Sequence, residues 1–541
     1  MTQMTGGEAI VAELRRHAVD VVFGLPGAQI YGLFDALYSE RTHLRVIGAR
    51  HEQGCAYMAL GYARSTGRPG VYSVVPGPGM LNTAAALLTA YGCNAPVLCL
   101  TGQVPSAFFG RGRGHLHEMP DQLGTMRGVV KWAERIEHPA MAASAVAQAF
   151  QHMRSGRPGP AALEMFWDQF TDKAEVELLD PLPLLPLPAV DLDRIERAAS
   201  LIHQARAPMI LVGGGAVDAG PEVLELAEML QAPVVALRNG RGVVSEANDL
   251  ALNIASGFHL WQTTDLLIAI GTRLEIVEWR WGYRPEGLKS IRIDIDPAEV
   301  RRYRCDVNLV ADSSAATRAL IDSTRKRGTA SSGRLDLICA AKAKTATEVA
   351  AVQPQIGYLQ AIRAVLPDDG FFVDDLSQVG FTSWFGFPVY RTRSYISSGY
   401  QGTLGSGFGT ALGVKVGNPD KPVVSVCGDG GFMFAVQELA TAVQFGIGVV
   451  VVVFNNASFA NVRRDQEQSF AGHVIGADLV NPDFVKLADA FGAQGSRVSS
   501  PAEFKPVLEQ ALARSAPCLI EVRLERGTEA NPWPFINPKR A

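Results

Sequence analysis

Two apolar runs in the last third of the sequence constrain the fold more than any other feature. The first, Val423–Gly430, ends in Gly-Asp-Gly, and the second, Val449–Asn456, ends in Asn-Asn. A helix-like segment, Gln437–Ala442, lies between them. This pattern predicts a strand–helix–strand unit with parallel strands. Because ligands bind at the carboxyl ends of parallel strands, Asp429 and Asn456 are expected to face the same ligand.

The residue types at these two strand ends suit a divalent cation that also holds phosphate. An aspartate oxygen, an asparagine amide oxygen and a backbone carbonyl are ligands that a hard cation such as Mg²⁺ accepts. Gly428, Gly430 and Gly431 lack side chains and would let a phosphate group approach the backbone closely. The alternative is an ordinary strand–helix–strand unit with a glycine turn and no ligand.

The rest of the chain alternates strand-like and helix-like segments in the same way. Its apolar runs are continuous, as in strands that are covered on both faces, which predicts parallel sheets in an α/β fold. Four prolines mark a linker at Asp180–Val190, and Lys326–Gly333 is a polar hinge. We therefore predict three consecutive parallel-sheet α/β domains, at residues 1–180, 190–325 and 350–541.

Composition narrows the class of protein without identifying the function. The chain has 541 residues, 47% of them hydrophobic, and a net charge of −4. It therefore lacks the excess of positive charge that is typical of proteins that bind nucleic acid or a membrane surface. The N-terminus has no signal-peptide pattern, and no apolar run has the length of a membrane span. The seven cysteines are scattered, so reduced thiols in a cytoplasmic protein are expected.

Several polar residues follow predicted strands of the first domain. Glu52 stands just after the second strand, Asn82 closes a glycine-rich turn, and Gln29 follows Pro26 in another strand-end loop. Glu52 could be a catalytic carboxylate or an acid that starts a helix, and Gln29 could act in catalysis or begin a helix. His117 lies in a His-x-His-Glu sequence, for which a metal site and a solvated loop are the alternatives.

The third domain has two further candidate phosphate loops. Ser377 and Gln378 follow an apolar strand, and the glycine-dense stretch 398–409, which includes Gly402 and Leu404, leads into a predicted helix. A glycine-rich turn before a helix can cradle phosphate, or can simply allow close packing.

The 29-residue span from Gly428 to Asn456 resembles the cofactor signature of thiamine diphosphate enzymes. Motifs around Glu52 and Gly402 resemble the acetolactate synthase-like and benzaldehyde lyase-like branch, and the resemblance covers nearly the whole chain. It implies pyrimidine-binding, central and diphosphate-binding domains in that order. It also implies that Asp429, Asn456 and the main-chain carbonyl of Ser458 hold Mg²⁺, which holds the diphosphate.

The resemblance assigns further roles to the candidate residues. Glu52 would touch N1′ of the cofactor's pyrimidine, Leu404 would wedge between its two rings, and the carbonyl of Gly402 would accept from its 4′-amino group. His117 occupies the place of an active-site glutamine, and Gln29 that of a histidine in benzaldehyde lyase. The complete set implied for the cofactor is Pro26, Glu52, Asn82, Ser377, Gln378, Gly402, Leu404, Gly428, Asp429, Gly430, Gly431, Asn456 and Ser458.

The activity implied by the resemblance is acetolactate synthase-like carboligation of 2-keto acids. The alternatives are a lyase that acts on 2-hydroxy ketones or 2-hydroxyacyl-CoA, and a 2-keto acid decarboxylase. Asn461 and Asp465 are polar where biosynthetic acetolactate synthases carry an apolar residue and a tryptophan, which weakens the synthase reading. Arg463 or Arg464 could bind a substrate carboxylate or phosphate, or lie on a solvated helix.

The resemblance also bears on other ligands and on assembly. The central domain could bind FAD or an ADP-like group, but the run after Arg273 lacks the Phe-Asp-Asp-Arg sequence typical of FAD-binding acetolactate synthases. In the family, Glu52 and Asp429 would meet across a subunit interface, which implies a homodimer or homotetramer. The proline-containing tail, 527–541, is either a lid over the site or a disordered end.

Overall fold

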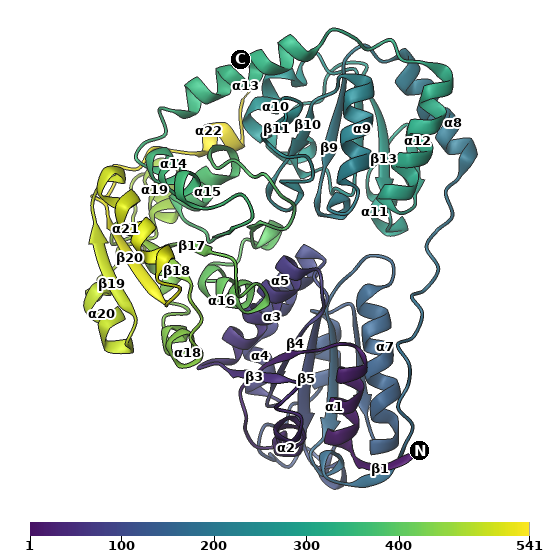
Figure 1. Cartoon of the computed structure of the whole chain (residues 1–541), viewed down its shortest axis with the longest axis vertical. Coiled ribbons are helices and arrows are strands. Elements are labelled where there is room, and N and C mark those ends of the chain that lie inside the picture. The colour runs from purple at the N-terminus through teal and green to yellow at the C-terminus, as the bar shows by residue number, and fades with distance from the viewer. Residues whose placement is uncertain (540–541) are drawn as a thin grey trace.

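The computed structural model describes residues 1–539 and contains three six-stranded parallel sheets, one in each third of the chain (Figure 1). The first sheet has the strand order β3-β2-β4-β5-β7-β6. Its strands are β2 (Val21–Gly24), β3 (Arg45–Gly48), β4 (Gly70–Val74), β5 (Val97–Gln103), β6 (Trp132–Ile136) and β7 (Ala161–Phe166). Every pairing in this sheet is parallel, so the loops after the strands meet at one edge.

The central and C-terminal sheets repeat this architecture. The central order is β11-β10-β9-β12-β13-β14, and the C-terminal order is β16-β15-β17-β18-β20-β19. The central strands are β9 (Pro208–Val212), β10 (Val234–Ala236), β11 (Ala251–Asn253), β12 (Leu266–Ile270), β13 (Lys289–Asp294) and β14 (Val307–Val310). The C-terminal strands are β15 (Phe371–Asp374), β16 (Tyr395–Ile396), β17 (Val423–Gly428), β18 (Val450–Asn455), β19 (Gln494–Val498) and β20 (Cys518–Arg523). The prediction of three parallel-sheet α/β units is therefore confirmed.

The predicted linker and hinge fall between these sheets. No helix or strand lies between β8 (Lys173–Val176) and α8 (Leu192–Gln204), and the extended chain there runs along the outside of the molecule to the central unit (Figure 1). The polar hinge overlaps the end of α12 (Ser313–Arg327) and precedes α13 (Leu335–Val349). One pairing was not foreseen: β1 (Thr2–Thr5) and β8 form a separate antiparallel ribbon that joins the two ends of the first unit.

The first and third units pack through a helix pair that requires glycine. Helix α3 (Glu52–Thr66) lies against α16 (Gly407–Gly417). A Cβ on Gly61 would lie 1.9 Å from the carbonyl oxygen of Thr410, and a Cβ on Gly413 would lie 1.8 Å from that of Met58. Only glycine allows the two backbones to approach so closely. Among residues 1–539, no helix is both long and apolar enough to cross a membrane.

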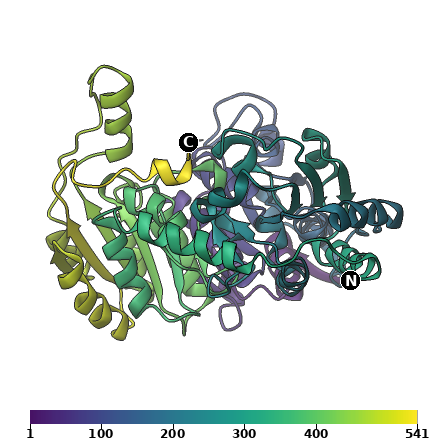
Figure 2. The ribbon, with the colours of Figure 1, turned by 90° about the horizontal axis from the view of Figure 1, so that it is seen from above.

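The C-terminal segment returns from the third sheet to the central unit. After β20, the chain runs to α22 (Trp533–Ile536), which lies near the central helices, as the yellow trace in both views shows (Figures 1 and 2). Arg280 Nη1 of the central unit donates to Asn537 Oδ1 at 3.2 Å. The tail, for which a lid and a disordered end are the alternatives, contains α22 and contacts the central unit through Asn537, and residues 540–541 lie outside the described part.

Candidate functional site

Glu52 is the first residue of α3, directly after β3, and its carboxylate is largely enclosed. Its side chain is 17% exposed, and its Oε2 accepts a hydrogen bond from Asn82 Nδ2 at 3.0 Å. Asn82 ends α4 (Pro78–Asn82), which follows β4. The chain turns from β3 into α3 because His51 caps the helix, its Nδ1 accepting from the backbone N–H of Gln53. Two predicted site residues thus meet at the carboxyl edge of the first sheet.

Gln29 and His117 form a second pair at the same edge. Gln29 Oε1 lies 2.7 Å from His117 Nδ1, and Gln29 Nε2 donates to the carbonyl of Leu116. Gln29 does not begin a helix: it is buried, with φ 71°, in the loop before α2 (Tyr31–Ser39) that also holds Pro26. Because a carbonyl oxygen can only accept, Nδ1 of His117 carries the hydrogen, and Nε2 is left as the proton acceptor.

The backbone around this pair is strained and tightly packed. His117 has φ 62°, and a Cβ on Gly77 would lie 2.6 Å from the His117 carbonyl oxygen. Residues with positive φ concentrate at functional sites, where the surrounding structure supports them. Gln122 holds Gly77 in place, because its Oε1 accepts from the Gly77 N–H at 2.7 Å while its Nε2 donates to Glu164 at 2.7 Å.

The His-x-His-Glu sequence is not arranged as a metal site. The carboxylate of Glu118 accepts hydrogen bonds from the backbone N–H groups of Gly112, Gly114 and His115, and these bonds lower its pKa. Within the described residues, no group of three or more His, Cys, Asp or Glu side chains is placed to hold a metal. Glu118 therefore closes a loop, as in the alternative reading of this sequence.

Asp429 and Asn456 occupy neighbouring strand ends of the third sheet. Asp429 begins α17 (Asp429–Phe432) after β17, and Asn456 follows β18. Burial raises the pKa of the Asp429 carboxyl, although the hydrogen bond that it accepts from Asn481 lowers it. Asn456 Oδ1 accepts from the N–H of Ser458 at 3.0 Å and from its hydroxyl at 2.9 Å. The three predicted metal-holding residues therefore lie together.

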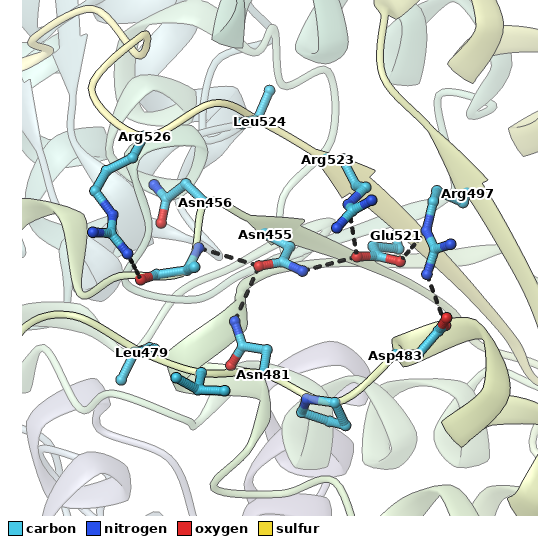
Figure 3. A pocket seen from close by; sticks show the side chains of 13 residues that line it. Asn455, Asn456, Leu479, Asn481, Asp483, Arg497, Glu521, Arg523, Leu524 and Arg526 are labelled. Atoms are coloured by element: carbon cyan, nitrogen blue, oxygen red, sulfur yellow. Dashed lines mark hydrogen bonds and ion pairs between the residues drawn. The ribbon is translucent and has the colours of Figure 1, made fainter.

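Asn481 is a site residue that sequence reasoning missed. Its Nδ2 donates to Asp429 Oδ2 at 2.7 Å and to Asn455 Oδ1 at 3.0 Å, so it holds one oxygen of the Asp429 carboxylate. Figure 3 shows Asn481 pointing up toward Asn455 across a polar pocket of about 560 Å³. The only local signal is its place before Pro482–Asp483, where Asp483 caps the next helix.

The two predicted phosphate loops lie on either side of a buried carboxyl group. Asp375 Oδ1 accepts from the N–H of Leu376 at 2.8 Å and from that of Gly405 at 3.1 Å, which ties the two loops together. Burial raises the pKa of Asp375 to about 6, against the effect of these N–H groups. Sequence reasoning did not single out Asp375, whose role depends on a loop 30 residues away.

These loops hold a buried donor that is available to a ligand. Ser377 caps α15 (Gln378–Gly386), its hydroxyl accepting from the Gly380 N–H at 3.0 Å. Gln378 Nε2 is a buried donor for which no partner occurs among the described residues. Gly402 has φ 55°, and the side chain of Leu404 lies against Gly431.

The C-terminal tail and α19 (Ala460–Ser469) add further polar groups. Arg464 Nη2 donates to Gln378 Oε1 at 2.9 Å, and its Nη1 donates to Asn531 Oδ1 at 3.2 Å. Arg463 instead forms ion pairs with Glu467 and, at 2.9 Å, with Asp478 on the surface. The sequence did not distinguish the roles of these two arginines. In the structure, Arg463 lies at the surface, and Arg464 faces the predicted phosphate loop that contains Gln378.

Glu529 is a second site residue that the sequence did not indicate. Asn456 Nδ2 donates to Glu529 Oε2 at 2.5 Å. Burial raises the pKa of Glu529 to about 7, although the hydrogen bond from Asn456 and the charge of Arg464 both lower it.

The central unit has a small pocket beside Gly213–Gly215. Its volume is about 100 Å³, and the guanidinium of Arg238 in its wall bonds to Glu275. A Cβ on Gly213 would lie 2.4 Å from the carbonyl oxygen of Gly271, so this glycine serves the packing of two loops. The binding of FAD or an ADP-like group here stays a prediction.

Comparison with known proteins identifies the class of this chain. Three family models match it: "Thiamine pyrophosphate enzyme, N-terminal TPP binding domain" at residues 4–125, the "central domain" at 195–320 and the "C-terminal TPP binding domain" at 375–522. A probable acetolactate synthase large subunit of Methanocaldococcus jannaschii is 32% identical over 99% of this chain and 94% of its own length.

Two further relatives show the range of this similarity. Acetolactate synthase isozyme 1 large subunit of Escherichia coli is 29% identical over 100% of this chain and 97% of its own. A probable 2-ketoarginine decarboxylase AruI of Pseudomonas aeruginosa is 31% identical over 96% and 94%. The chain therefore belongs to the thiamine diphosphate (thiamine pyrophosphate) enzymes, in their acetolactate synthase-like branch.

The residues present fit this cofactor and a divalent cation. The carboxylate of Asp429 and the amide oxygen of Asn456 supply oxygen ligands of the type that Mg²⁺ prefers. The buried, unpartnered N–H₂ of Gln378 is a donor suited to a diphosphate oxygen. Glu52, enclosed at the other domain's strand edge, suits contact with a pyrimidine ring nitrogen.

Proposed function

We propose that this protein is a thiamine diphosphate- and Mg²⁺-dependent enzyme that forms carbon–carbon bonds from 2-keto acids, as an acetolactate synthase does. The observation that carries the proposal is the grouping of Asp429, Asn456 and Ser458 at adjacent strand ends, with Glu52 at the corresponding edge of the first sheet. The names of the relatives from Methanocaldococcus jannaschii and Escherichia coli support the choice of activity.

The chain's own residues would divide the work of cofactor binding. Asp429, Asn456 and the carbonyl of Ser458 would hold the metal, and the Nε2 group of Gln378 would donate to the diphosphate. Glu52, whose carboxyl group is largely shielded from water, would share a proton with N1′ of the pyrimidine. When bound, thiamine diphosphate supplies the electron sink for breaking and forming the bond next to the carbonyl.

His117 is proposed as the acid/base on the substrate side. Gln29 fixes its tautomer, so that Nε2 can take a proton from the substrate or return one. A general acid or base must reach the reacting atom within hydrogen-bond distance, and the ring of His117 is held at the same strand edge as Glu52.

Arg464 is proposed to bind the substrate carboxylate. Its guanidinium is half-buried beside Gln378, and its bonds to Gln378 and Asn531 are to neutral carbonyl oxygens. A guanidinium with N–H groups near a cofactor loop is suited to the paired oxygens of a keto acid.

A second copy of the chain is proposed to complete each site. Within one chain, Glu52 bonds to Asn82 just before α5 (Ala84–Cys93), whereas Thr403, next to Leu404, bonds to Thr89 at 2.8 Å. Asn82 and Thr89 are seven positions apart, which is about 10 Å of nearly continuous helix. We therefore propose that the Glu52 and the Leu404 loop that contact one pyrimidine come from two different chains of a homodimer or homotetramer.

The decisive experiment is product analysis by NMR after incubating the purified protein with pyruvate, thiamine diphosphate and Mg²⁺. We expect acetolactate from the wild type and from Glu137→Gln, which changes an exposed glutamate in the same domain. Glu52→Gln should lose at least about 100-fold in rate, because it removes the shared proton. Full turnover by Glu52→Gln with every active substrate would refute the catalytic assignment.

A second candidate function is a lyase or decarboxylase. Asn461 is polar, and its Oδ1 accepts from Trp533 Nε1 at 2.6 Å, so the helix that would line the acceptor pocket carries polar rather than apolar groups. The 2-ketoarginine decarboxylase among the relatives supports the same alternative. Cofactor binding without acetolactate formation would favour it, and hydroxy ketones, acyl-CoA compounds and larger 2-keto acids would be the next substrates to test.

A further inference from the structure

The segment after β20 is fastened to the candidate metal site and to α19 by three side chains. Glu529 accepts from Asn456, Asn531 accepts from Arg464, and Trp533 donates to Asn461. Of these three tail residues, Glu529 contacts Asn456 at the candidate metal site, and Asn531 and Trp533 contact two residues of α19.

The contact with Glu529 fixes which way the Asn456 amide points. Its Nδ2 donates to Glu529 at 2.5 Å, and its Oδ1 accepts from the N–H and the hydroxyl of Ser458. A reversed amide would place its NH₂ against the Ser458 N–H and its oxygen against the Glu529 carboxylate. Both arrangements are unfavourable, since donors would face donors and an acceptor would face an acceptor.

Amide orientation matters because only the oxygen can bind a metal ion. An asparagine that is free to rotate by 180° offers the wrong atom part of the time, and its oxygen carries less negative charge when its NH₂ has no acceptor. Groups that hydrogen-bond to metal ligands orient them and raise their affinity for the ion.

We infer that Glu529 is a positioning residue of the metal site, which holds Asn456 with its amide oxygen toward the ion. The inference rests on the proposed function of Asp429, Asn456 and Ser458 as the metal-holding set. Glu529 touches Asn456 and is not itself assigned as a ligand, so it acts through the amide and not on the substrate.

Glu529 is held firmly enough for this role. The next residue, Ala530, is bonded on both sides: its N–H donates to the carbonyl of Gln353 at 3.0 Å, and its carbonyl accepts from Gln355 Nε2 at 2.7 Å. The charge of Arg464 also attracts the carboxylate. The tail therefore presents Glu529 at a fixed point.

The test measures metal binding by the full-length protein. Mn²⁺ binding in the presence of saturating thiamine diphosphate is followed by electron paramagnetic resonance, for the wild type, Glu529→Ala, Glu529→Gln and Glu525→Gln. Glu525 is an exposed glutamate of the same segment and serves as the control. Thermal unfolding without cofactor reports on folding of each variant, independently of the metal.

We expect Glu529→Ala to weaken Mn²⁺ binding by about 10- to 100-fold, because loss of a residue that hydrogen-bonds to a metal ligand generally lowers metal affinity by this factor. Glu529→Gln should recover most of the affinity, because its amide oxygen still accepts from Asn456 Nδ2. If Glu529 had only a structural role, Glu529→Ala would lower the unfolding temperature of the apoprotein, and Glu529→Gln would not restore Mn²⁺ affinity.

Two results would overturn the inference. One is an affinity of Glu529→Ala within about twofold of the Glu525→Gln control. The other is a glutamine variant as weak as the alanine variant, which would assign the effect to charge and not to amide orientation. If the wild type itself binds neither Mn²⁺ nor thiamine diphosphate, the proposed function fails, and this outcome is distinguishable from both.

Discussion

The side-chain oxygen of Gln29 lies 2.7 Å from Nδ1 of His117, although 88 positions separate the two residues in the sequence. Each comes from a different strand-end loop, and both have positive φ angles. A glutamine amide that also bonds to the Leu116 carbonyl cannot rotate, so it imposes one tautomer on the imidazole. The first domain therefore supplies both the proposed acid/base group and the residue that orients it.

Removal of either member of this pair should slow catalysis without loss of cofactor binding. We expect His117→Ala to lower kcat by about 100-fold, because general acid–base catalysis contributes about that much. Gln29→Ala should cost less, about 10-fold, since the histidine remains but can adopt the other tautomer. Steady-state kinetics measures both, with the exposed His43→Ala as the control. An unchanged kcat in His117→Ala would show that another group transfers the proton.

Substitution of Arg464 should act on substrate affinity. We expect Arg464→Met to raise the KM for the keto acid by at least about 10-fold, because a guanidinium–carboxylate pair contributes about 1.5–3 kcal/mol. Arg463→Met is the matched control, since the neighbouring arginine pairs with Glu467 and Asp478 on the surface. Equal effects of the two changes on KM would contradict the assignment of Arg464.

Loss of Asn481 should weaken the metal site through Asp429. In Asn481→Ala, Asp429 Oδ2 loses the donor that lies 2.7 Å away, and the carboxylate gains freedom to turn. We expect the Kd for Mg²⁺ to rise by about 10-fold or more, measured by titration calorimetry with thiamine diphosphate present. Unaltered Mg²⁺ affinity, with a folded protein, would mean that the bond from Asn481 does not prepare the ligand.

The first domain should lose stability on acidification because of His17. Its side chain is 5% exposed and stacks on Phe150 at 4.1 Å between ring centroids, and burial lowers its pKa from 6.5 to about 4. The unfolded chain therefore binds the proton more readily below pH 6.5. The stability due to the neutral ring is complete above pH 6.5 and is lost as the pH falls toward 4.

The variant His17→Phe should remove this pH dependence while keeping the stacked ring. Between pH 6.5 and 4, we expect the wild type to lose up to about 3 kcal/mol more of its unfolding free energy than the variant. Denaturant titrations at several pH values measure the difference. Parallel stability curves for the two proteins across this range would contradict the assignment to His17.

Residues at strand ends could be predicted from the sequence, because the apolar runs locate the strands and the next polar residue marks the edge. Asp429 and Asn456 are of this kind, and the structure brings them together with Ser458. Asn481 and Glu529 could not be found in this way. Their roles depend on how a loop and a tail pack against the sheet, and no local pattern records that packing.

The same distinction explains what was missed in the fold. The continuous runs of valine and isoleucine predicted most strands in the interior of the sheets. Strands β6 and β1 were not predicted, because β6 contains Glu134 and Arg135 and β1 is a short polar strand at the start of the chain. Arg135 is accommodated because it pairs at 2.6 Å with Glu164 of the neighbouring strand. A buried ion pair of this kind is visible only when the partner strand is known.

The bonds between the tail and α19 also limit which substitutions either segment can accept alone. Asn461 and Arg464 are each matched to a particular tail residue, Trp533 and Asn531. A substitution on the helix alone would leave a polar group of the tail without its hydrogen-bond partner, which would lower stability. Transplanting α19 from a relative should therefore succeed only when residues 529–533 are exchanged with it, so the two segments should be treated as one unit in engineering.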